Sequence, residues 1–371
     1  MNIAIDARGI NWYKGTGIGT YTDNILTNLL EIDDHNKYNI YWSMDNYSRF
    51  KKKNTNIIMT SKRHQRFFEQ NYFPNHLRRE NIDLFWLPQN GMGLLGEGAN
   101  KYVITIHDLI PYIMPETVGR GYLNKFLKEM PHIIEKSHGI LTVSQWSKND
   151  ILKFFPMNES KIHVVPLAAN HNYRPLDKSM CTEYIKNNFG IDKDFVLYVG
   201  GFSKRKNIKS LVDVLSKANL KKDYLLVLPG SIKDEGEKLL DYVKSKGMEK
   251  KIIFPGYCSE EGLSILYNTC SLFVYPSFYE GFGLPPLEAM CCGAPVLCSN
   301  LTSIPEVVGE YGVLFDPYDM DMFKRELESI LNDDEKILYL KNKSLEGAKN
   351  FSWKKTAEKT LIALNNIHNS C

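Results

Sequence analysis

Residues 277–290 read Ser-Phe-Tyr-Glu-Gly-Phe-Gly-Leu-Pro-Pro-Leu-Glu-Ala-Met and directly follow the short apolar run 272–275. Such a run is typical of a strand that is covered on both faces of a parallel sheet. The two glycines of the stretch permit a tight turn, and the two prolines suit the first turn of a helix, where a missing N–H group costs little. The stretch therefore predicts a strand, a turn and a helix in succession, as in a βαβ unit.

The same alternation of apolar runs and helical patterns extends outward from this stretch along nearly the whole chain. It predicts an α/β fold with parallel sheets, and 371 residues are enough for two domains. We place these domains at residues 1–170 and 176–351, followed by a helix within 352–371. The predicted strands are 2–6, 38–43, 56–60, 83–87, 102–106, 139–143, 162–165, 195–199, 224–228, 252–254, 272–275, 295–298 and 312–315.

The composition argues against several classes of protein. Lys and Arg total 46 against 43 Asp and Glu, and with a net charge of +3 and no recognised binding module we expect no nucleic-acid partner. No apolar run reaches the ~20 residues of a transmembrane helix. The first apolar run contains Asp6 and no basic segment precedes it, so it indicates a strand and not a signal peptide. The seven cysteines form no Cys-x-x-Cys pair, and we expect reduced thiols and a cytoplasmic location.

Two loops that contain glycine are candidates for binding phosphate. The first, at 15–19, precedes a helical pattern at 24–30 and is as consistent with a plain turn as with an anion site. The second, at 200–201, ends a strand and is followed by three consecutive cations at 204–206. It fits either a solvated basic turn or a diphosphate clamp in which Arg205 and Lys206 neutralise phosphate oxygens.

Two acids flank the start of the helix predicted after residue 283. Glu280 precedes this helix and Glu288 lies about one turn inside it. They are too far apart to act as one carboxylate pair, but they could bracket an elongated ligand. Compensation of the helix dipole is an alternative explanation that covers Glu280 better than Glu288.

A basic stretch occupies residues 49–79 of the first domain. It contains a single acid, Glu69, and four aromatic residues between positions 67 and 73. The stretch fits a solvated surface, or a surface for an anionic partner such as a lipid-linked acceptor or the inner leaflet of a membrane. Its basic residues are Arg49, Lys51, Lys52, Lys53, Lys62, Arg63, Arg66, Arg78 and Arg79.

The spacing of Glu280 and Glu288 resembles the Glu-x7-Glu motif of the retaining glycosyltransferases of family 4, and the resemblance covers essentially the whole chain. It includes the glycine loop at 15–19, Ile-His-Asp-Leu-Ile-Pro at 106–111, and the positions 143–144, 147, 165–167, 290–295, 303–307 and 351–353. The resemblance implies the GT-B fold, in which two Rossmann-like domains face a central cleft and a C-terminal helix, here 352–371, crosses back to the first domain. It assigns the acceptor to the first domain and the nucleotide-sugar donor to the second.

The resemblance also implies roles for residues of the second domain. Glu288 would bind the ribose hydroxyls, Glu280 would bind hydroxyls of the transferred sugar, and Lys206 would bind phosphate. Many members of the family carry an arginine where this chain has Gly201, and we expect Arg205 to supply the missing guanidinium. The other donor-binding residues are Gly200, Gly256, Tyr257, Gly281, Phe282, Gly283 and Leu284, of which Gly256 and Tyr257 lie where the family places the base.

In the first domain, His107 matches the histidine that faces the donor sugar. Gly17 and Gly19 match the glycine loop that closes on phosphate and acceptor, and we place Asp108 and Ser144 on the acceptor side. The catalytic residues implied by the resemblance are thus His107, Glu280, Lys206 and Arg205.

We therefore expect a retaining hexosyltransferase that acts on a glycan or lipid-linked glycan. Among the candidate donors we rank GDP-mannose first, with mannose as the transferred sugar. A UDP-sugar-dependent transferase, a nucleotide-sugar 2-epimerase and a non-catalytic nucleotide-sugar-binding subunit are the alternatives. We expect no cofactor and no metal ion, because Lys206 and Arg205 can stabilise the leaving diphosphate. The Asp-Met-Asp at 319–321 follows the last predicted strand, and we do not expect it to bind metal.

Overall fold

The computed structural model describes residues 1–91, 98–232 and 235–370, which form two compact units. The first unit is Met1–Leu167 together with Phe351–Cys371, and the second is Ala168–Asn350. Residues 168–170, which the sequence placed in the first domain, thus belong to the second unit. One reason is that the Asn170 side chain donates a hydrogen bond to Glu260 of that unit at 2.6 Å.

The first unit is built on a seven-stranded sheet in the order β3-β2-β1-β4-β5-β6-β7, and every neighbouring pair is parallel. Its strands are short apolar segments that are buried almost throughout, apart from the edge strands β3 and β7, so both faces of the sheet are covered. The strands are β1 (Asn2–Asp6), β2 (Lys37–Trp42), β3 (Thr55–Met59), β4 (Leu84–Leu87), β5 (Lys101–Ile106), β6 (Gly139–Thr142) and β7 (Ile162–Val164).

The second unit is built on a six-stranded parallel sheet in the order β10-β9-β8-β11-β12-β13. Together the two sheets contain each of the strands predicted from the sequence, with ends that differ by one or two residues. The strands of this unit are β8 (Phe195–Leu197), β9 (Leu225–Val227), β10 (Ile252–Ile253), β11 (Leu272–Tyr275), β12 (Val296–Ser299) and β13 (Val313–Phe315).

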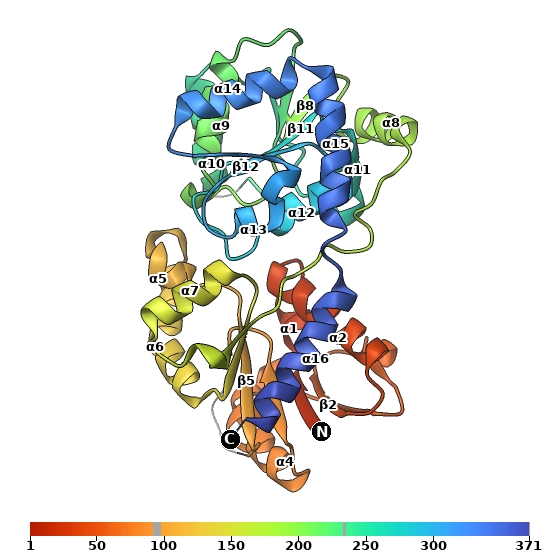
Figure 1. Ribbon diagram of the computed structural model, residues 1–371, viewed down its shortest axis with the longest axis vertical. Coiled ribbons are helices and arrows are strands. Elements are labelled where there is room, and N and C mark those ends of the chain that lie inside the picture. The colour runs from red at the N-terminus through yellow and green to blue at the C-terminus, as the bar shows by residue number, and fades with distance from the viewer. Residues whose placement is uncertain (92–97, 233–234, 371) are drawn as a thin grey trace. The chain divides into compact units, whose positions relative to one another are not determined.

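Helices cover both faces of the second sheet (Figure 1). α9, α10 and α14 lie on one side, and α8, α11, α12 and α15 lie on the other. Between them they enclose the main hydrophobic core of the unit. The helices are α8 (Lys178–Phe189), α9 (Ile208–Lys217), α10 (Glu235–Ser245), α11 (Glu260–Thr269), α12 (Leu284–Cys291), α13 (Ile304–Val308), α14 (Met320–Leu331) and α15 (Asp334–Ala348).

The last helix of the chain, α16 (Trp353–Asn369), belongs to the first unit, as predicted. Ser352 caps it by accepting a hydrogen bond from the Lys355 N–H. The hydroxyl of Thr356 donates to the Pro166 carbonyl at 2.8 Å, and α16 packs along α2 (Figure 1). The other helices of this unit are α1 (Gly9–Trp12), α2 (Gly17–Ile32), α3 (Gln65–Phe67), α4 (Phe73–Arg79), α5 (Ile110–Ile113), α6 (Arg120–Lys136) and α7 (Gln145–Phe154).

In each sheet the strand order reverses at one position, between β1 and β4 in the first unit and between β8 and β11 in the second. Ligands of open parallel sheets bind beyond the carboxyl ends of the strands at such a reversal. In the second unit this places the loop after β8 beside the loop after β11. Those are the loops that carry the predicted cations and Glu280.

Among the described residues, no helix is both long enough and apolar enough to span a membrane.

Candidate active site

The loop after β8 is shaped by Tyr198 and the two glycines that follow it. Gly200 has a φ of +150°, and a Cβ there would lie 2.6 Å from the Tyr198 hydroxyl oxygen, so a larger residue would be both strained and obstructed. The Tyr198 hydroxyl donates to the Gly201 carbonyl at 2.8 Å. The chain then forms a short 3₁₀ turn, Lys204–Lys206, which brings both predicted phosphate-binding cations to the sheet edge.

The loop after β11 is fastened to this turn. The Arg205 carbonyl accepts a hydrogen bond from the Phe278 N–H at 2.9 Å, and the Ser277 hydroxyl oxygen lies 3.2 Å from the same carbonyl. The Arg205 guanidinium in turn donates to the Tyr279 carbonyl. The two loops are therefore one hydrogen-bonded assembly, although about 75 residues separate them in the sequence.

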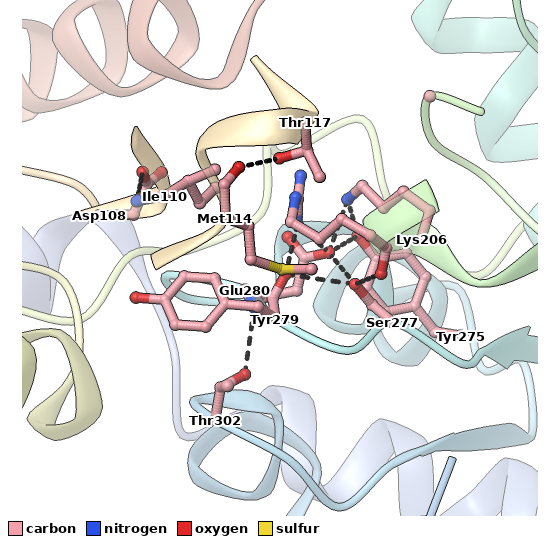
Figure 2. Close-up of polar contacts among 12 residues, drawn as sticks. Asp108, Ile110, Met114, Thr117, Lys206, Tyr275, Ser277, Tyr279, Glu280 and Thr302 are labelled. Atoms are coloured by element: carbon pink, nitrogen blue, oxygen red, sulfur yellow. Dashed lines mark hydrogen bonds and ion pairs between the residues drawn. The ribbon is translucent and has the colours of Figure 1, made fainter. Parts of the chain in front are cut away.

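Glu280 lies at the centre of this assembly (Figure 2). Its Oε1 atom is 2.7 Å from Lys206 Nζ, 2.8 Å from Arg205 Nη1, 2.6 Å from Ser277 Oγ and 3.1 Å from the Tyr275 hydroxyl. Among the described residues, none contributes a polar contact to Oε2. The carboxylate is thus held by one oxygen, and the other is left to accept hydrogen bonds from a ligand.

The charge state of Glu280 follows from these contacts. Burial on its own would raise the pKa of the carboxyl group, but the charges of Lys206 and Arg205 outweigh it and lower the pKa to about 2. Glu280 and Lys206 are each 9% exposed, so solvent screens the pairing only weakly. The carboxylate is therefore ionised at any physiological pH.

The turn between Glu280 and α12 is supported from the segment after β12. Thr302 Oγ1 accepts a hydrogen bond from the Glu280 N–H at 3.1 Å, and Ser303 Oγ lies 2.9 Å from the Glu280 carbonyl and 2.7 Å from the Phe282 carbonyl. Gly283 has a φ of +120° and forms the N-cap of α12. Pro285 and Pro286 carry no N–H group and the Leu287 N–H donates to the Gly283 carbonyl, so the start of α12 offers a ligand the Leu284 N–H, four residues after Glu280.

Glu288 lies one turn into α12, the helix that follows Glu280. Tyr267 donates a hydrogen bond to its Oε2 at 3.0 Å. Burial raises the pKa of Glu288 to about 7, and the nearby charge of Glu260 acts in the same direction. Near neutral pH the carboxyl group is therefore partly ionised, and its ionised form can accept one hydrogen bond from each hydroxyl of a vicinal pair.

Gly256 and Tyr257 follow β10 at the same edge of the second sheet. Gly256 accepts a hydrogen bond from the Gly230 N–H at 2.8 Å, which joins the loops after β9 and β10. The Tyr257 side chain is 85% exposed, so its ring is available to a ligand.

In the first unit, His107 follows β5 and is 8% exposed. Its backbone N–H donates to Asn90 Oδ1 at 3.0 Å, and its Nε2 atom lies 2.9 Å from the Pro88 carbonyl. Because a carbonyl only accepts, Nε2 carries the proton and Nδ1 is left as an acceptor. Burial lowers the pKa of His107 to about 4, so the ring is neutral at pH 7.

The other predicted residues of the first unit have structural contacts of their own. Asp108 Oδ1 accepts from the Ile110 N–H at 3.0 Å, at the start of α5. Ser144 is 1% exposed and caps α7, where its hydroxyl accepts from the Ser147 N–H at 3.0 Å. The sequence predicted that Gly17 and Gly19 lie in a loop that precedes a helix, but both residues lie within the helix. Thr16 accepts from the Gly19 N–H and thereby starts α2 at Gly17, seven residues before the predicted helical pattern.

Sequence reasoning missed a buried ion pair in the first unit. Arg8 Nη2 lies 2.7 Å from Asp6 Oδ2 and 3.0 Å from Glu69 Oε1, and all three side chains are at most 6% exposed. The acid of the basic stretch is thus turned inward. A charged pair directly after a buried strand, Asp-Ala-Arg, is the signal that could have identified Asp6 and Arg8.

The nine basic side chains of residues 49–79 are all exposed. Some have local partners: Arg49 pairs with Asp23 at 2.6 Å, and Lys52 Nζ donates to the Leu30 carbonyl at 2.6 Å. With Glu69 buried, the stretch presents cations to solvent, and Phe67 is 55% exposed among them. Phe73, another of the four aromatic residues of the stretch, is in the core at 2% exposure.

Within the described residues, no group of three or more His, Cys, Asp or Glu side chains is arranged to hold a metal ion. Asp319 of the Asp-Met-Asp sequence instead caps α14 by accepting from the Met322 N–H at 2.8 Å.

Known proteins resemble the chain along its entire length. The family model described as "Glycosyltransferase Family 4" matches residues 17–173, and the one described as "Glycosyl transferases group 1" matches residues 182–346. O-antigen chain mannosyltransferase B of Escherichia coli is 30% identical over an alignment of 370 residues, which covers 95% of this chain and 96% of that relative. Serotype-specific mannosyltransferase WbdA of Escherichia coli is 33% identical over an alignment of 263 residues, which covers 69% of this chain but 32% of that longer protein.

The fold is that of solved glycosyltransferases. The sucrose-phosphate synthase of Thermosynechococcus elongatus superposes with a TM-score of 0.76 over 99% of both chains, at 18% sequence identity. The two parallel-sheet units, the full-length relative and the two matching family models agree. The chain is a glycosyltransferase of family 4 with the GT-B fold.

Proposed function

We propose that the chain transfers mannose from GDP-mannose, with retention of configuration, to a glycan or lipid-linked glycan in the synthesis of a surface polysaccharide. The choice of sugar rests on the two relatives of Escherichia coli, both named as mannosyltransferases. The observation that carries the chemistry is the convergence of Lys206 and Arg205 on one oxygen of Glu280, at the reversal point of the second sheet.

Breaking a sugar–diphosphate bond develops positive charge on the sugar and negative charge on the leaving group. We infer that Lys206, Arg205 and the Leu284 N–H at the start of α12 stabilise the departing diphosphate. These groups are already in place, so little reorganisation is needed when charge develops. They supply the positive charge that a metal ion provides in other transferases, and we propose that the reaction needs no metal.

Glu280 has the complementary task on the sugar side. Its Oε1 atom is occupied by four donors, and we infer that Oε2 accepts hydrogen bonds from hydroxyls of the transferred sugar. Glu288, one turn further along α12, would bind the ribose hydroxyls, and the exposed Tyr257 would lie against the base. Neutral His107 would offer its Nδ1 atom to a hydroxyl of the donor sugar.

For retention we propose that the acceptor attacks on the face from which the diphosphate leaves. A double displacement would require a second carboxylate ~5 Å from the first across the sugar. Glu280 Oε1 is held by the cations, and Asp108 of the first unit already accepts a hydrogen bond from the Ile110 N–H, so we assign neither carboxylate the role of a covalent nucleophile. The leaving phosphate itself would take the proton of the acceptor hydroxyl.

We propose that the exposed basic stretch, residues 49–79, contacts anionic lipid on the inner face of the membrane. Each basic side chain near such a surface contributes about 1 kcal/mol of attraction. A lipid-linked acceptor presents its phosphate at the same surface. The chain would then act in the cytoplasm, as a peripheral protein.

A panel of nucleotides and an acceptor assay test this proposal. GDP, UDP, ADP and dTDP, each with and without an attached hexose, are added in a thermal-shift experiment, since a ligand of the folded state raises its stability. GDP-mannose should give the largest shift, and radiolabelled mannose should pass to a lipid extract equally well with EDTA present. A larger thermal shift with UDP-sugars would mean that the donor is a UDP-sugar and not GDP-mannose. Formation of the epimerised nucleotide sugar in the absence of acceptor would indicate a 2-epimerase, and binding without turnover would indicate a non-catalytic subunit.

A further inference from the structure

Tyr275, the last residue of β11, connects the two charged groups of the site. Its hydroxyl lies 2.5 Å from Lys206 Nζ and 3.1 Å from Glu280 Oε1 (Figure 2). An ammonium group only donates and a carboxylate only accepts, so the hydroxyl must accept from Lys206 and donate to Glu280. The single proton of this hydroxyl must therefore point toward Glu280. A tyrosine that only packs against its neighbours, or that faces solvent, would not need a fixed proton position.

The ring of Tyr275 is fixed as firmly as its hydroxyl. The side chain is fully buried, and its ring centroid lies 4.9 Å from Lys206 Nζ. On one face it stacks on Tyr198 at 5.9 Å with an interplanar angle of 15°. The ring stack and the cation–π contact thus hold the hydroxyl in this position.

Tyr198 carries this arrangement over to the glycine turn. Its hydroxyl donates to the Gly201 carbonyl, and the absence of a Cβ at Gly200 makes room for that hydroxyl. The stacked tyrosines stand at the ends of neighbouring strands on either side of the reversal point. They therefore link the backbone of the proposed phosphate site to the carboxylate of the proposed sugar site.

We propose that Tyr275, braced by Tyr198, is a positioning residue that aligns Lys206 for the diphosphate and turns Oε2 of Glu280 toward the transferred sugar. The inference rests on the proposed function, because it presupposes a nucleotide sugar at this site. Three other donors remain on Oε1 when the Tyr275 hydroxyl is removed. The carboxylate would then stay charged but lose its fixed orientation.

The decisive quantity is the gain in affinity that the sugar provides, expressed as Kd of the nucleoside diphosphate divided by Kd of the nucleotide sugar. Tyr275→Phe keeps the ring stack and removes only the hydroxyl. We expect this ratio to fall about 10-fold, as for loss of a hydrogen bond to a charged group, and kcat to fall at least as far. The affinity for the nucleoside diphosphate itself should fall by no more than about 3-fold, because Lys206 keeps its contact with Glu280 Oε1 when the Tyr275 hydroxyl is removed.

Tyr224→Phe is the matched control. Tyr224 is a buried tyrosine of the same unit whose hydroxyl donates to the Leu331 carbonyl at 3.0 Å, away from both loops. Both variants lose one buried hydroxyl and should lose similar thermal stability, but Tyr224→Phe should leave the ratio and kcat unchanged. Tyr198→Phe, which frees the glycine turn, should instead weaken binding of the nucleoside diphosphate and the nucleotide sugar together.

The outcomes separate the inference from the proposed function. If wild-type protein binds no nucleotide sugar better than its nucleoside diphosphate, the proposed function is wrong, and the positioning role is wrong with it. If wild-type protein shows the gain and Tyr275→Phe keeps both the ratio and kcat, the role of Tyr275 alone is wrong. Equal effects of Tyr275→Phe and Tyr224→Phe on the ratio would likewise show that the contribution of Tyr275 is packing alone.

Discussion

Glu280→Gln separates the two tasks that we assign to the charged cluster, because it keeps the shape of the side chain and removes its charge. In the wild-type protein, a diphosphate must compete with Glu280 for Lys206 and Arg205, which lie 2.7 and 2.8 Å from its Oε1 atom. In the variant both cations are without their carboxylate partner. We therefore predict that the nucleoside diphosphate binds more tightly while sugar transfer falls.

The size of the effect follows from the pKa of Glu280. Its fall from an ordinary value of 4.5 to about 2 corresponds, at 1.36 kcal/mol per pKa unit, to about 3 kcal/mol in favour of the ionised form. A diphosphate that no longer competes can recover part of this free energy, which in full corresponds to about 300-fold in Kd. We expect a gain of about 10-fold, since the glutamine still occupies part of the site, and a loss of transfer of 100-fold or more.

The assay combines titration calorimetry with GDP and a transfer assay with radiolabelled donor. Glu261→Gln, which removes the same charge from an exposed position on α11, is the matched control and should leave both quantities unchanged. Weaker GDP binding by Glu280→Gln would refute the competition between carboxylate and phosphate. Unchanged transfer would remove Glu280 from the site.

Three further predictions address other parts of the molecule. Burial raises the pKa of Glu288 from 4.5 to about 7, so ionisation of this buried carboxyl group lowers the stability of the folded protein as the pH rises through that range. In urea unfolding, Glu288→Gln should be more stable than wild type by up to about 3 kcal/mol at pH 8 and no more stable at pH 4. Equal stability of the two proteins at pH 8 would contradict the burial of an ionised carboxylate. A Cβ at Gly201 would have no neighbour within 4 Å, so Gly201→Arg should keep its melting temperature and bind GDP at least as tightly as wild type, whereas a large drop in melting temperature would show that the turn excludes a side chain. Replacing Lys51, Lys52 and Lys53 with Glu should lower the affinity for anionic vesicles, measured by co-sedimentation at low salt, at least 100-fold and should not change binding to neutral vesicles. Unchanged co-sedimentation with anionic vesicles would mean that the stretch is only a solvated surface.

Local sequence patterns were sufficient for most of the fold. The apolar runs between turn residues identify the strands of both sheets because buried parallel strands are short and continuously apolar. Ser352, an N-cap followed by a periodic apolar face, identifies α16. Gly17 and Gly19 were misplaced because glycine disfavours helix interiors, and the contribution of Thr16 as a cap outweighed that preference.

The motif residues of the site were also predictable, but their partners were not. Glu280, Lys206 and Arg205 stand out as charges in loops that follow strands. Tyr275 and Tyr198, however, look like ordinary members of apolar strands, and their hydroxyl groups acquire a role only when β8 and β11 become neighbours. Glu69 was hidden in the same way, since its partner Arg8 lies 61 positions away and a basic stretch surrounds it.

The stereochemistry of the product tests the central claim most directly. The protein is incubated with GDP-mannose labelled with ¹³C at the anomeric carbon and with a lipid-linked acceptor extract, and the one-bond carbon–hydrogen coupling of the new linkage is read by NMR. We predict the coupling of an α-mannoside together with one GDP released per sugar transferred, and no product from Glu280→Gln on the same timescale. A β-mannoside would contradict retention at this site, and full product formation by Glu280→Gln would contradict the role of the carboxylate on which the mechanism depends.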